Sequence, residues 1–357
     1  DVVENQATTP REMATIQAAG IALDERLWVS PRCHVVMPYH PRVEAVYEQA
    51  KGRASTGTTG RGMGPVYADK VSYNGIRLAD LADEGVFAEK LRVQLELKNA
   101  LLRAYEMEAL DFQPVLQEKL AQYARLRHVV REPFGLLQAA LRRGAEIVLE
   151  GAQGALLDND WGTYPFCTAS TTLAGGAAAG LGIAPRWIER VVGVAKAYTT
   201  RVGSGPMPTE LLDETGEAIR QAGAEFGTVT GRPRRCGWFD ADLVRFTAAL
   251  NGCTEIALTK LDVLDGLAQI KIGVGYRTKA GQPAFYWQGD ARWLEGCQPE
   301  YIELEGWRQP ITAARQWHNL PRQAQTYVRK VEELVETPVR WVSVGPGRDE
   351  TLEVPQG

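Results

Sequence analysis

Four short apolar runs, each followed directly by a loop of glycines or polar residues, constrain the fold of this chain more than any other feature. They lie at 146–149, 191–195, 256–259 and 339–342. Each has the length of a buried strand, and segments with helical periodicity, such as 86–106 and 322–336, separate them. Strands that alternate with helices are typical of a parallel sheet covered by helices. The sequence therefore predicts an α/β fold with a large, mainly parallel central sheet flanked by helices, in a single domain over 1–357.

The longest of these loops, EGAQGALLDNDWGTYPFCTASTTLAGG at 150–176, holds one amide, Gln153, between two glycines. Two carboxylates, Asp158 and Asp160, and the hydroxyls of Thr168–Thr172 follow it. Glycines, an amide and hydroxyls between a strand end and a helix suit a crevice at the carboxyl end of a sheet, where small ligands bind. An ordinary crossover with polar surface residues explains the same pattern, so the loop by itself leaves both interpretations open.

A second glycine-rich loop, GTTGRGMGP at 57–65, lies nearer the start of the chain. It is not a Walker A loop, because no Gly-Lys-Ser/Thr follows. Its glycines allow backbone N–H groups to face an anion, and Thr58, Thr59 and Arg61 add further donors. The loop is consistent with phosphate binding and also with a solvent-exposed turn.

Basic side chains are concentrated in one segment, EFGTVTGRPRRCGWFD at 225–240, which contains Arg232, Arg234 and Arg235. Guanidinium groups bind carboxylates and phosphates through two parallel hydrogen bonds. A solvated basic surface is the alternative, but in a chain of net charge −4 we favour an anionic small molecule as the partner. Arg201, in TTRVGSG after the 191–195 strand, similarly suits a carboxylate or ribose contact, or else a simple turn.

The run at 256–259 is followed at once by Lys260-Leu261-Asp262. A carboxylate at this strand end can accept hydrogen bonds from the ring N–H and amino group of guanine, a pattern that adenine does not present. The apolar stem of Lys260 can lie over the base. The tripeptide alone is common, so its meaning depends on the segments around it.

Composition excludes several classes of protein. The net charge of −4 argues against a protein that coats nucleic acid or a membrane surface, and no apolar run is long enough for a membrane span. The five cysteines are widely spaced and form no C-x-x-C pair, which indicates neither a disulfide framework nor a zinc site. A reducing cytoplasmic environment fits this pattern.

Taken together, six segments resemble adenylosuccinate synthetase in order and spacing. They are GTTGRGMGPVYADKV, the Gln153 loop, AKAYTTRVGSGPMPTEL, EFGTVTGRPRRCGWFD, LTKLDVLDGL and VSVGPGRDET. The resemblance implies a P-loop-NTPase-related synthetase fold and a ligase of purine biosynthesis. GTP would phosphorylate the 6-oxygen of IMP, and L-aspartate would displace that phosphate to give adenylosuccinate. It also implies Mg²⁺, one per subunit, a cytoplasmic homodimer, and no nucleic-acid or membrane partner.

The same resemblance assigns residues by their position in the motifs. Gln153 is the catalytic residue implied in this chain, as a donor to the 6-oxygen region of the purine. The expected IMP-binding residues are Thr59, Gln153, Thr168 and Arg232. The expected aspartate-binding residues are Thr228, Val229, Thr230 and Arg232. The expected GTP-binding residues are Arg234, Lys260, Leu261, Asp262, Ser343, Val344 and Gly345.

Two departures from the family pattern qualify this assignment. The GDEGKG and HNAGH strings do not occur, and they would supply the base at purine N1, the phosphoryl-transfer histidine and the Mg²⁺ ligands. We therefore expect an amino-terminally incomplete sequence that lacks the first strand and its loop, contains no metal ligand and is inactive alone. Tyr73 replaces an arginine that reaches the partner's IMP phosphate, which leaves open a sister ligase acting on dGMP. A non-catalytic nucleotide-binding subunit is the other alternative.

Overall fold

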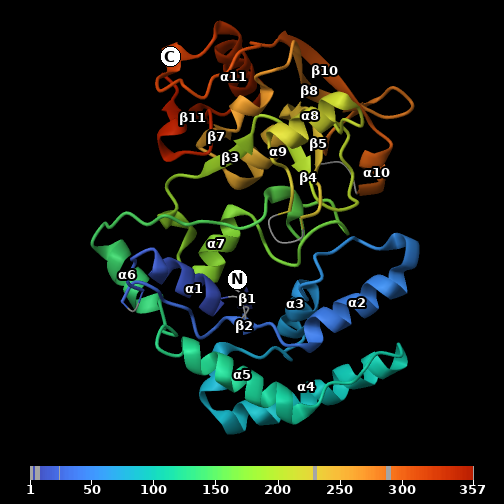
Figure 1. The fold of residues 1–357 in the computed structure, drawn as a ribbon, viewed down its shortest axis with the longest axis vertical. Helices are drawn as coiled ribbons and strands as arrows, with labels where there is room; N and C mark the ends of the chain where they lie inside the picture. Colours follow the sequence, from blue (N-terminus) through green and yellow to red (C-terminus); the bar gives the residue numbers. More distant parts are fainter. Residues whose placement is uncertain (1–2, 5–8, 24, 228–230, 287–290, 357) are drawn as a thin grey trace. The chain divides into compact units, whose positions relative to one another are not determined.

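The structure is a computed structural model that describes residues 3–4, 9–23, 25–227, 231–286 and 291–356 (Figure 1). Contacts divide the chain into two compact units. Unit 1 comprises residues 1–160 and 167–187, and unit 2 comprises residues 161–166 and 188–357. The assignment of a single domain to 1–357 stays a prediction alongside this division.

The regular elements of the described chain are α-helices and strands, and helices α2 to α7 follow one another with no strand between them. The α-helices are α1 Thr9–Ala18, α2 Tyr39–Lys51, α3 Met63–Val71, α4 Glu84–Ala104, α5 Phe112–Leu126, α6 Phe134–Arg142, α7 Ala174–Leu181, α8 Glu214–Ala222, α9 Ala241–Asn251, α10 Ala291–Glu295 and α11 Arg322–Val335. The strands are β1 Val3–Glu4, β2 His34–Val35, β3 Val192–Lys196, β4 Thr199–Arg201, β5 Arg235–Gly237, β6 Phe239–Asp240, β7 Glu255–Thr259, β8 Gln269–Arg277, β9 Pro283–Ala284, β10 Gln298–Glu305, β11 Val339–Ser343 and β12 Thr351–Glu353.

Unit 1 is held together by the apolar face of α4. The predicted stripe of Phe87, Leu91 and Leu95 is buried, with Phe87 and Leu91 completely so, because residues four apart lie on one side of a helix. The carboxylate of Asp83 caps the helix by accepting hydrogen bonds from the N–H groups of Gly85 and Val86. The periodicity predicted at 86–106 therefore corresponds to α4.

Unit 2 contains the main sheet, in the strand order β12-β11-β7-β3. Strand β7 pairs in parallel with both β3 and β11, and only β12 runs antiparallel to its neighbour. The predicted α/β class with a mainly parallel sheet is confirmed. A second sheet has the order β10-β8-β6, and β9 pairs antiparallel with β8 across a turn in which Gly281 has a φ of +76°.

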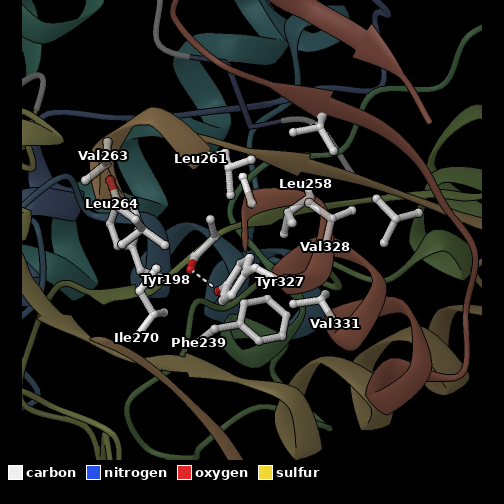
Figure 2. Close-up of a cluster of buried hydrophobic side chains, with 14 of the residues drawn as sticks. Tyr198, Phe239, Leu258, Leu261, Val263, Leu264, Ile270, Tyr327, Val328 and Val331 are labelled. Carbon is white, nitrogen blue, oxygen red and sulfur yellow. Dashed lines mark hydrogen bonds between the residues drawn. The ribbon is translucent and has the colours of Figure 1, made fainter. Parts of the chain in front are cut away.

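Helix α11 covers the core of unit 2 and packs against α9 and β11 (Figure 1). Its apolar face is buried through Tyr327, Val328 and Val331, which are fully inaccessible to solvent. The hydroxyl of Tyr327 donates a 2.6 Å hydrogen bond to the carbonyl oxygen of Ala197, directly after β3 (Figure 2). This bond ties the helix to the carboxyl end of the sheet, where the predicted GTP-binding residues Lys260 and Ser343 lie.

The strand predicted at 146–149 is wrong. Residues 145–150 have no regular secondary structure, and the side chain of Val148 is 91% exposed. A strand is stable only when a neighbour satisfies its backbone hydrogen bonds. None of the strands that the structure describes pairs with this segment, so its apolar composition alone does not make it a strand.

Asp240 is a buried carboxylate at the start of α9. It accepts a 3.1 Å hydrogen bond from the N–H of Leu243 and another from the hydroxyl of Tyr276. Burial raises the pKa of Asp240 to about 7, against the effect of these two bonds, and the nearby carboxylate of Asp242 raises it further. The folded state therefore favours the protonated form of this side chain.

Replacing Asp240 by Asn is expected to flatten the pH dependence of stability. An unfolded aspartate titrates near pH ~4, so the stability that Asp240 contributes is complete below pH ~4 and is lost as the pH rises towards 7. Between pH 5 and 8 the wild type should lose about 2–3 kcal/mol more than the variant. Urea unfolding at several pH values measures this difference. Asp213→Asn, at the exposed cap of α8, is the matched control, and equal slopes for the wild type and D240N would contradict the assignment.

Candidate functional site

The predicted guanine-binding residues of unit 2 lie at the ends of β7 and β11, which are neighbours in the sheet. The backbone N–H of Lys260 donates a 3.0 Å hydrogen bond to the Oγ of Ser343 and joins the two strand ends. Lys260 has a φ of +60°, which is rare for a residue with a side chain. This turn starts the short 3₁₀ helix Leu261–Leu264, so that Asp262 directly follows the strand end.

Leu261 and Val344 are fully buried in the core of unit 2. Their side chains stabilise the two strand ends, and only their backbone groups are left to meet a ligand. Gly345 lies against Glu350, and a Cβ at this position would come within 2.5 Å of the Glu350 Oε2 atom. A side chain at position 345 would therefore have to displace the carboxylate of Glu350.

Asp262 is half-buried beside these groups. Burial raises the pKa of its carboxyl; its own backbone N–H and Lys260 oppose this effect, whereas the negative charge of Glu350 adds to it. Lys260, Asp262, Ser343 and Gly345 are thus brought together by the structure, as the motifs predicted.

A buried carboxylate that the sequence analysis did not identify lies beside this group. Glu225 is completely inaccessible to solvent. Its Oε1 atom accepts hydrogen bonds from Lys196 Nζ at 2.7 Å, from the Tyr198 hydroxyl at 2.6 Å and from Lys260 Nζ at 3.0 Å. Its Oε2 atom accepts one from Arg234 Nη1 at 2.7 Å. We call these five residues the Glu225 cluster.

In the Glu225 cluster, the hydrogen bonds between the carboxylate and the surrounding cations favour the ionised form of each partner. Burial alone would raise the pKa of Glu225, but the hydrogen bonds from Lys196, Tyr198, Arg234 and Lys260 outweigh it and bring the pKa to about 2. Burial lowers the pKa of Lys196, and its hydrogen bond to Glu225 opposes that change. Three cations around one carboxylate give a net charge of +2, so the cluster attracts anions.

The arginine-rich loop begins and ends at the Glu225 cluster. The N–H of Arg234 donates to the carbonyl oxygen of Glu225 at 2.9 Å, and that of Gly227 donates to the carbonyl oxygen of Arg232 at 2.8 Å. These bonds make the described part of the loop a narrow hairpin with the exposed Arg232 near its tip. The predicted aspartate-binding residues Thr228, Val229 and Thr230 lie outside the described residues.

Arg235 has a different role from its two neighbours. Its guanidinium group forms two hydrogen bonds with the carboxylate of Glu210 and two with the carbonyl oxygens of Gly203 and Gly205. It therefore fastens the glycine-rich turn after β4. Arg201, for which a ligand contact was one interpretation, donates to Thr163 Oγ1 at 2.7 Å and to the carbonyl oxygens of Phe166 and Pro206. Both side chains make contacts within the protein.

Unit 1 holds three of the residues predicted to bind IMP, Thr59, Gln153 and Thr168, whereas Arg232 belongs to unit 2. Gln153 is exposed and has a φ of +64°, which makes a sharp turn after the irregular segment 145–150. The N–H of Thr168 donates to the carbonyl oxygen of Leu157 at 2.8 Å. The buried carboxylate of Asp158 accepts a 2.8 Å bond from the N–H of Thr172. Gln153 and Thr168 therefore belong to one folded loop.

Thr59 is exposed in the glycine-rich loop 57–65, which two carboxylates of α2 hold in place. Glu44 accepts a 2.8 Å bond from the N–H of Gly62. Glu48 accepts bonds from the hydroxyls of Ser55 and Thr56 and from the N–H of Gly57; burial raises the pKa of Glu48, but these bonds bring it well below its ordinary value. A hydrogen bond between the side chains of Tyr67 and Ser170 places α3, which begins within the loop, beside the segment that begins at Thr168.

The sequence analysis missed Glu44, Glu48 and Glu225 for a common reason. Each is an acidic side chain to which no motif assigned a role, and its partners lie several residues to dozens of residues away. A weak signal was present for Glu225, since it is the one acidic residue directly before a loop with three arginines.

Comparison with known proteins decides the family. The sequence pattern of the family described as adenylosuccinate synthetase matches residues 1–352. The chain belongs to the adenylosuccinate synthetase family. The predicted family and its class, a ligase of purine biosynthesis, are confirmed.

Similar proteins cover nearly the whole chain. Adenylosuccinate synthetase of Trichlorobacter lovleyi is 48% identical over 344 residues, which are 96% of this chain and 80% of that protein. The protein of the same name from Carboxydothermus hydrogenoformans is 46% identical and covers 99% of the chain and 83% of its own length. A solved structure of fully ligated adenylosuccinate synthetase from Plasmodium falciparum is similar with a TM-score of 0.91, at 33% identity over 99% of this chain and 83% of that one.

A more distant structure bears on the dGMP alternative. Succinoaminodeoxyadenylate synthetase of cyanophage S-2L, bound to dGMP and dATP, has a TM-score of 0.51 and 20% identity over 92% of this chain and 69% of that one. Such a likeness shows a shared fold alone. Because relatives with 46–48% identity are adenylosuccinate synthetases, the family match does not favour the dGMP-using alternative.

Two further findings concern membranes and metals. None of the described helices is long and apolar enough to cross a membrane. Within the described ranges, no three His, Cys, Asp or Glu side chains are grouped so that they could hold a metal ion. We therefore assign no metal ligand and no chemical step of Mg²⁺ to the described residues.

Proposed function

We propose that the chain binds GTP through Arg234, Lys260 and Asp262 in the reaction of its family, the ligation of IMP and aspartate to adenylosuccinate with GTP. The observation that carries this proposal is the Glu225 cluster, which holds Arg234 and Lys260 on one carboxylate next to the Lys260–Ser343 hydrogen bond. A net charge of +2 suits a phosphorylated ligand, and Asp262 supplies the acceptors that match guanine.

The remaining roles follow from side-chain chemistry. Gln153 carries an amide donor suited to the 6-oxygen of the purine, where negative charge grows as GTP transfers its phosphoryl group. Thr59 and Thr168 carry hydroxyl donors suited to the 5′-phosphate of IMP. Arg232 is exposed, and its planar guanidinium suits a carboxylate of L-aspartate. The 6-phosphoryl-IMP intermediate and Mg²⁺ as the partner of the GTP phosphates complete the proposal.

A binding experiment tests which of these residues contact IMP and which contact the guanine nucleotide. Thr59→Ala and Thr168→Ala should weaken IMP binding about threefold to tenfold each without changing GDP binding, because each removes one hydrogen bond. Lys260→Gln should weaken GDP binding and leave IMP binding unchanged. Isothermal titration calorimetry measures both ligands, and dGMP in place of IMP tests the alternative acceptor. This test does not depend on whether the chain completes the reaction alone.

Thr326→Ala is the matched control, because its hydroxyl donates only to the carbonyl oxygen of Arg322 within α11 among the contacts described. It should leave both affinities unchanged. If Thr59→Ala or Thr168→Ala weakened GDP rather than IMP binding, the division between nucleotides would be wrong. If the wild type bound neither GDP nor IMP, the proposed function itself would fail.

We also propose a cytoplasmic homodimer. Unit 1 exposes apolar side chains on two contacting helices, with Val71 and Tyr73 at the end of α3 and Val93 and Leu97 on α4. Asp69 of α3 forms an ion pair with Lys98 of α4, so these side chains belong to one region. Exposed apolar patches of this kind mark protein interfaces. Sedimentation velocity at micromolar concentration gives the subunit number, and a monomer there would contradict the proposal.

A further inference from the structure

The structure assigns to Glu225 the role of a positioning residue, which fixes Arg234 and Lys260 at the spacing that GTP binding requires. This inference rests on the proposed function, since it takes these two cations as contacts of the nucleotide. Glu225 itself is fully buried and lies under them. Arg234 and Lys260 are partly accessible, with 29% and 37% of their side-chain surfaces exposed.

The two carboxylate oxygens divide the cations between them. Arg234 binds Oε2, whereas Lys260 binds Oε1 together with Lys196 and Tyr198. Because a carboxylate is rigid and planar, the separation of its two oxygens sets the separation of the two ligand-facing cations. Without this carboxylate, two positive side chains at such short range would repel each other.

The backbone makes the position of Glu225 itself well defined. Its N–H donates to the carbonyl oxygen of Arg220 at 2.9 Å, and its carbonyl oxygen accepts from the N–H of Arg234 at 2.9 Å. The Nε of Arg220 then donates to the carbonyl oxygen of Arg234 at 2.8 Å. Lys260 is held a second time through its Nζ bond to the carbonyl oxygen of Gly223. A carboxylate anchored in this way can orient flexible side chains.

The net charge of the Glu225 cluster and the positioning of its cations predict opposite effects of Glu225→Gln on nucleotide affinity. Removal of the negative charge raises the net charge of the cluster from +2 to +3, so charge attraction alone would tighten the binding of an anionic nucleotide. If Glu225 positions Arg234 and Lys260, the same substitution must weaken binding, because a neutral amide holds the two cations less strongly. The direction of the change therefore separates the two explanations.

The test is the affinity of the whole chain for GDP at fixed ionic strength, measured by isothermal titration calorimetry. We expect Glu225→Gln to weaken GDP binding by about tenfold or more, as the loss of a charge-assisted hydrogen bond predicts. Circular dichroism at the titration temperature shows whether the variant is folded. Unchanged or tighter GDP binding by a folded variant would overturn the inference. A wild-type chain without GDP affinity would instead overturn the proposed function.

Tyr198→Phe is the second variant and covers the case in which Glu225→Gln does not fold. It removes one neutral donor from Glu225 Oε1 and leaves every charge in place. We expect GDP affinity to fall about twofold to tenfold, and an unchanged affinity would count against positioning through Glu225.

Asp242→Asn is the matched control for the loss of a buried carboxylate. Asp242 pairs with Arg245 in the same unit, at 2.6 Å, and makes no contact described with the Glu225 cluster. It should lose stability and retain the GDP affinity of the wild type. If Asp242→Asn weakened GDP binding as much as Glu225→Gln, the effect would be a general consequence of destabilisation and the inference would fall.

Discussion

Asp262→Asn is expected to weaken GTP binding by about 100-fold and to create binding of XTP. The carboxylate of Asp262 offers two acceptors, which match the ring N–H and the exocyclic amino group of guanine. An asparagine offers one acceptor and one donor. Its donor faces the guanine amino group without a partner, whereas xanthine carries an acceptor oxygen at that position. A site that loses a matched hydrogen bond in this way rejects the ligand strongly.

Competition titrations with GTP, XTP and ATP measure this change as a ratio of affinities. Asp265→Asn is the control: Asp265 lies in the loop directly after the same 3₁₀ helix, but its carboxylate accepts bonds from Trp307 Nε1 at 2.7 Å and from the N–H of Ile311 at 3.1 Å. That variant should keep the wild-type preference for GTP. If Asp262→Asn had the same ratio of GTP to XTP affinity as the wild type, the carboxylate of Asp262 would not determine the preference for guanine.

Local pattern was enough to predict helices α4 and α11 and the strands β3, β7 and β11 of the main sheet. The apolar stripe of α4 and the inner face of α11 follow from 3.6-residue periodicity, which is a property of the segment itself. The runs that became β3, β7 and β11 were also predicted correctly. The run at 146–149 has the same composition but pairs with none of the described strands. Composition indicates that a segment can form a strand, whereas a neighbouring strand decides whether it does.

In the site, too, short sequence segments predicted some residues, whereas contacts between residues far apart in sequence were missed. Lys260, Asp262 and Ser343 were predicted because the segments that contain them resemble motifs of the family. Glu225 begins the arginine-rich segment 225–240, but its role depends on Lys196 and Lys260, which are 29 and 35 residues away in sequence. Contacts over such separations form only in the folded chain, so a single sequence did not predict them.

Arg201, for which the sequence left a ligand contact and a simple turn open, makes hydrogen bonds within the protein. It donates hydrogen bonds to Thr163 and Phe166, which belong to the segment 161–166 of unit 2. The chain directly before and after this segment belongs to unit 1. Gly205 allows the arrangement, since a Cβ there would lie 2.0 Å from the guanidinium group. Arg201 therefore fastens segment 161–166 into unit 2.

Arg201→Met is accordingly expected to lower the free energy of unfolding by about 3 kcal/mol, because it removes three part-buried, charge-assisted hydrogen bonds. Methionine keeps most of the apolar stem, so the loss is attributable to the guanidinium group. Urea unfolding measures the change in free energy. Hydrogen exchange should show faster exchange at the amide of Phe166, which donates to the carbonyl oxygen of Thr163.

Arg190→Met is the control for the loss of an arginine at the surface. Arg190 forms two hydrogen bonds with Glu255, but 62% of its side chain is exposed. Exposed pairs contribute little, so this variant should lose less than about 1 kcal/mol. If both substitutions cost the same, or if exchange at Phe166 did not change in Arg201→Met, the guanidinium group would not be what holds segment 161–166. The contrast depends on burial, because solvent can replace the partner of Arg190 but not the partners of Arg201.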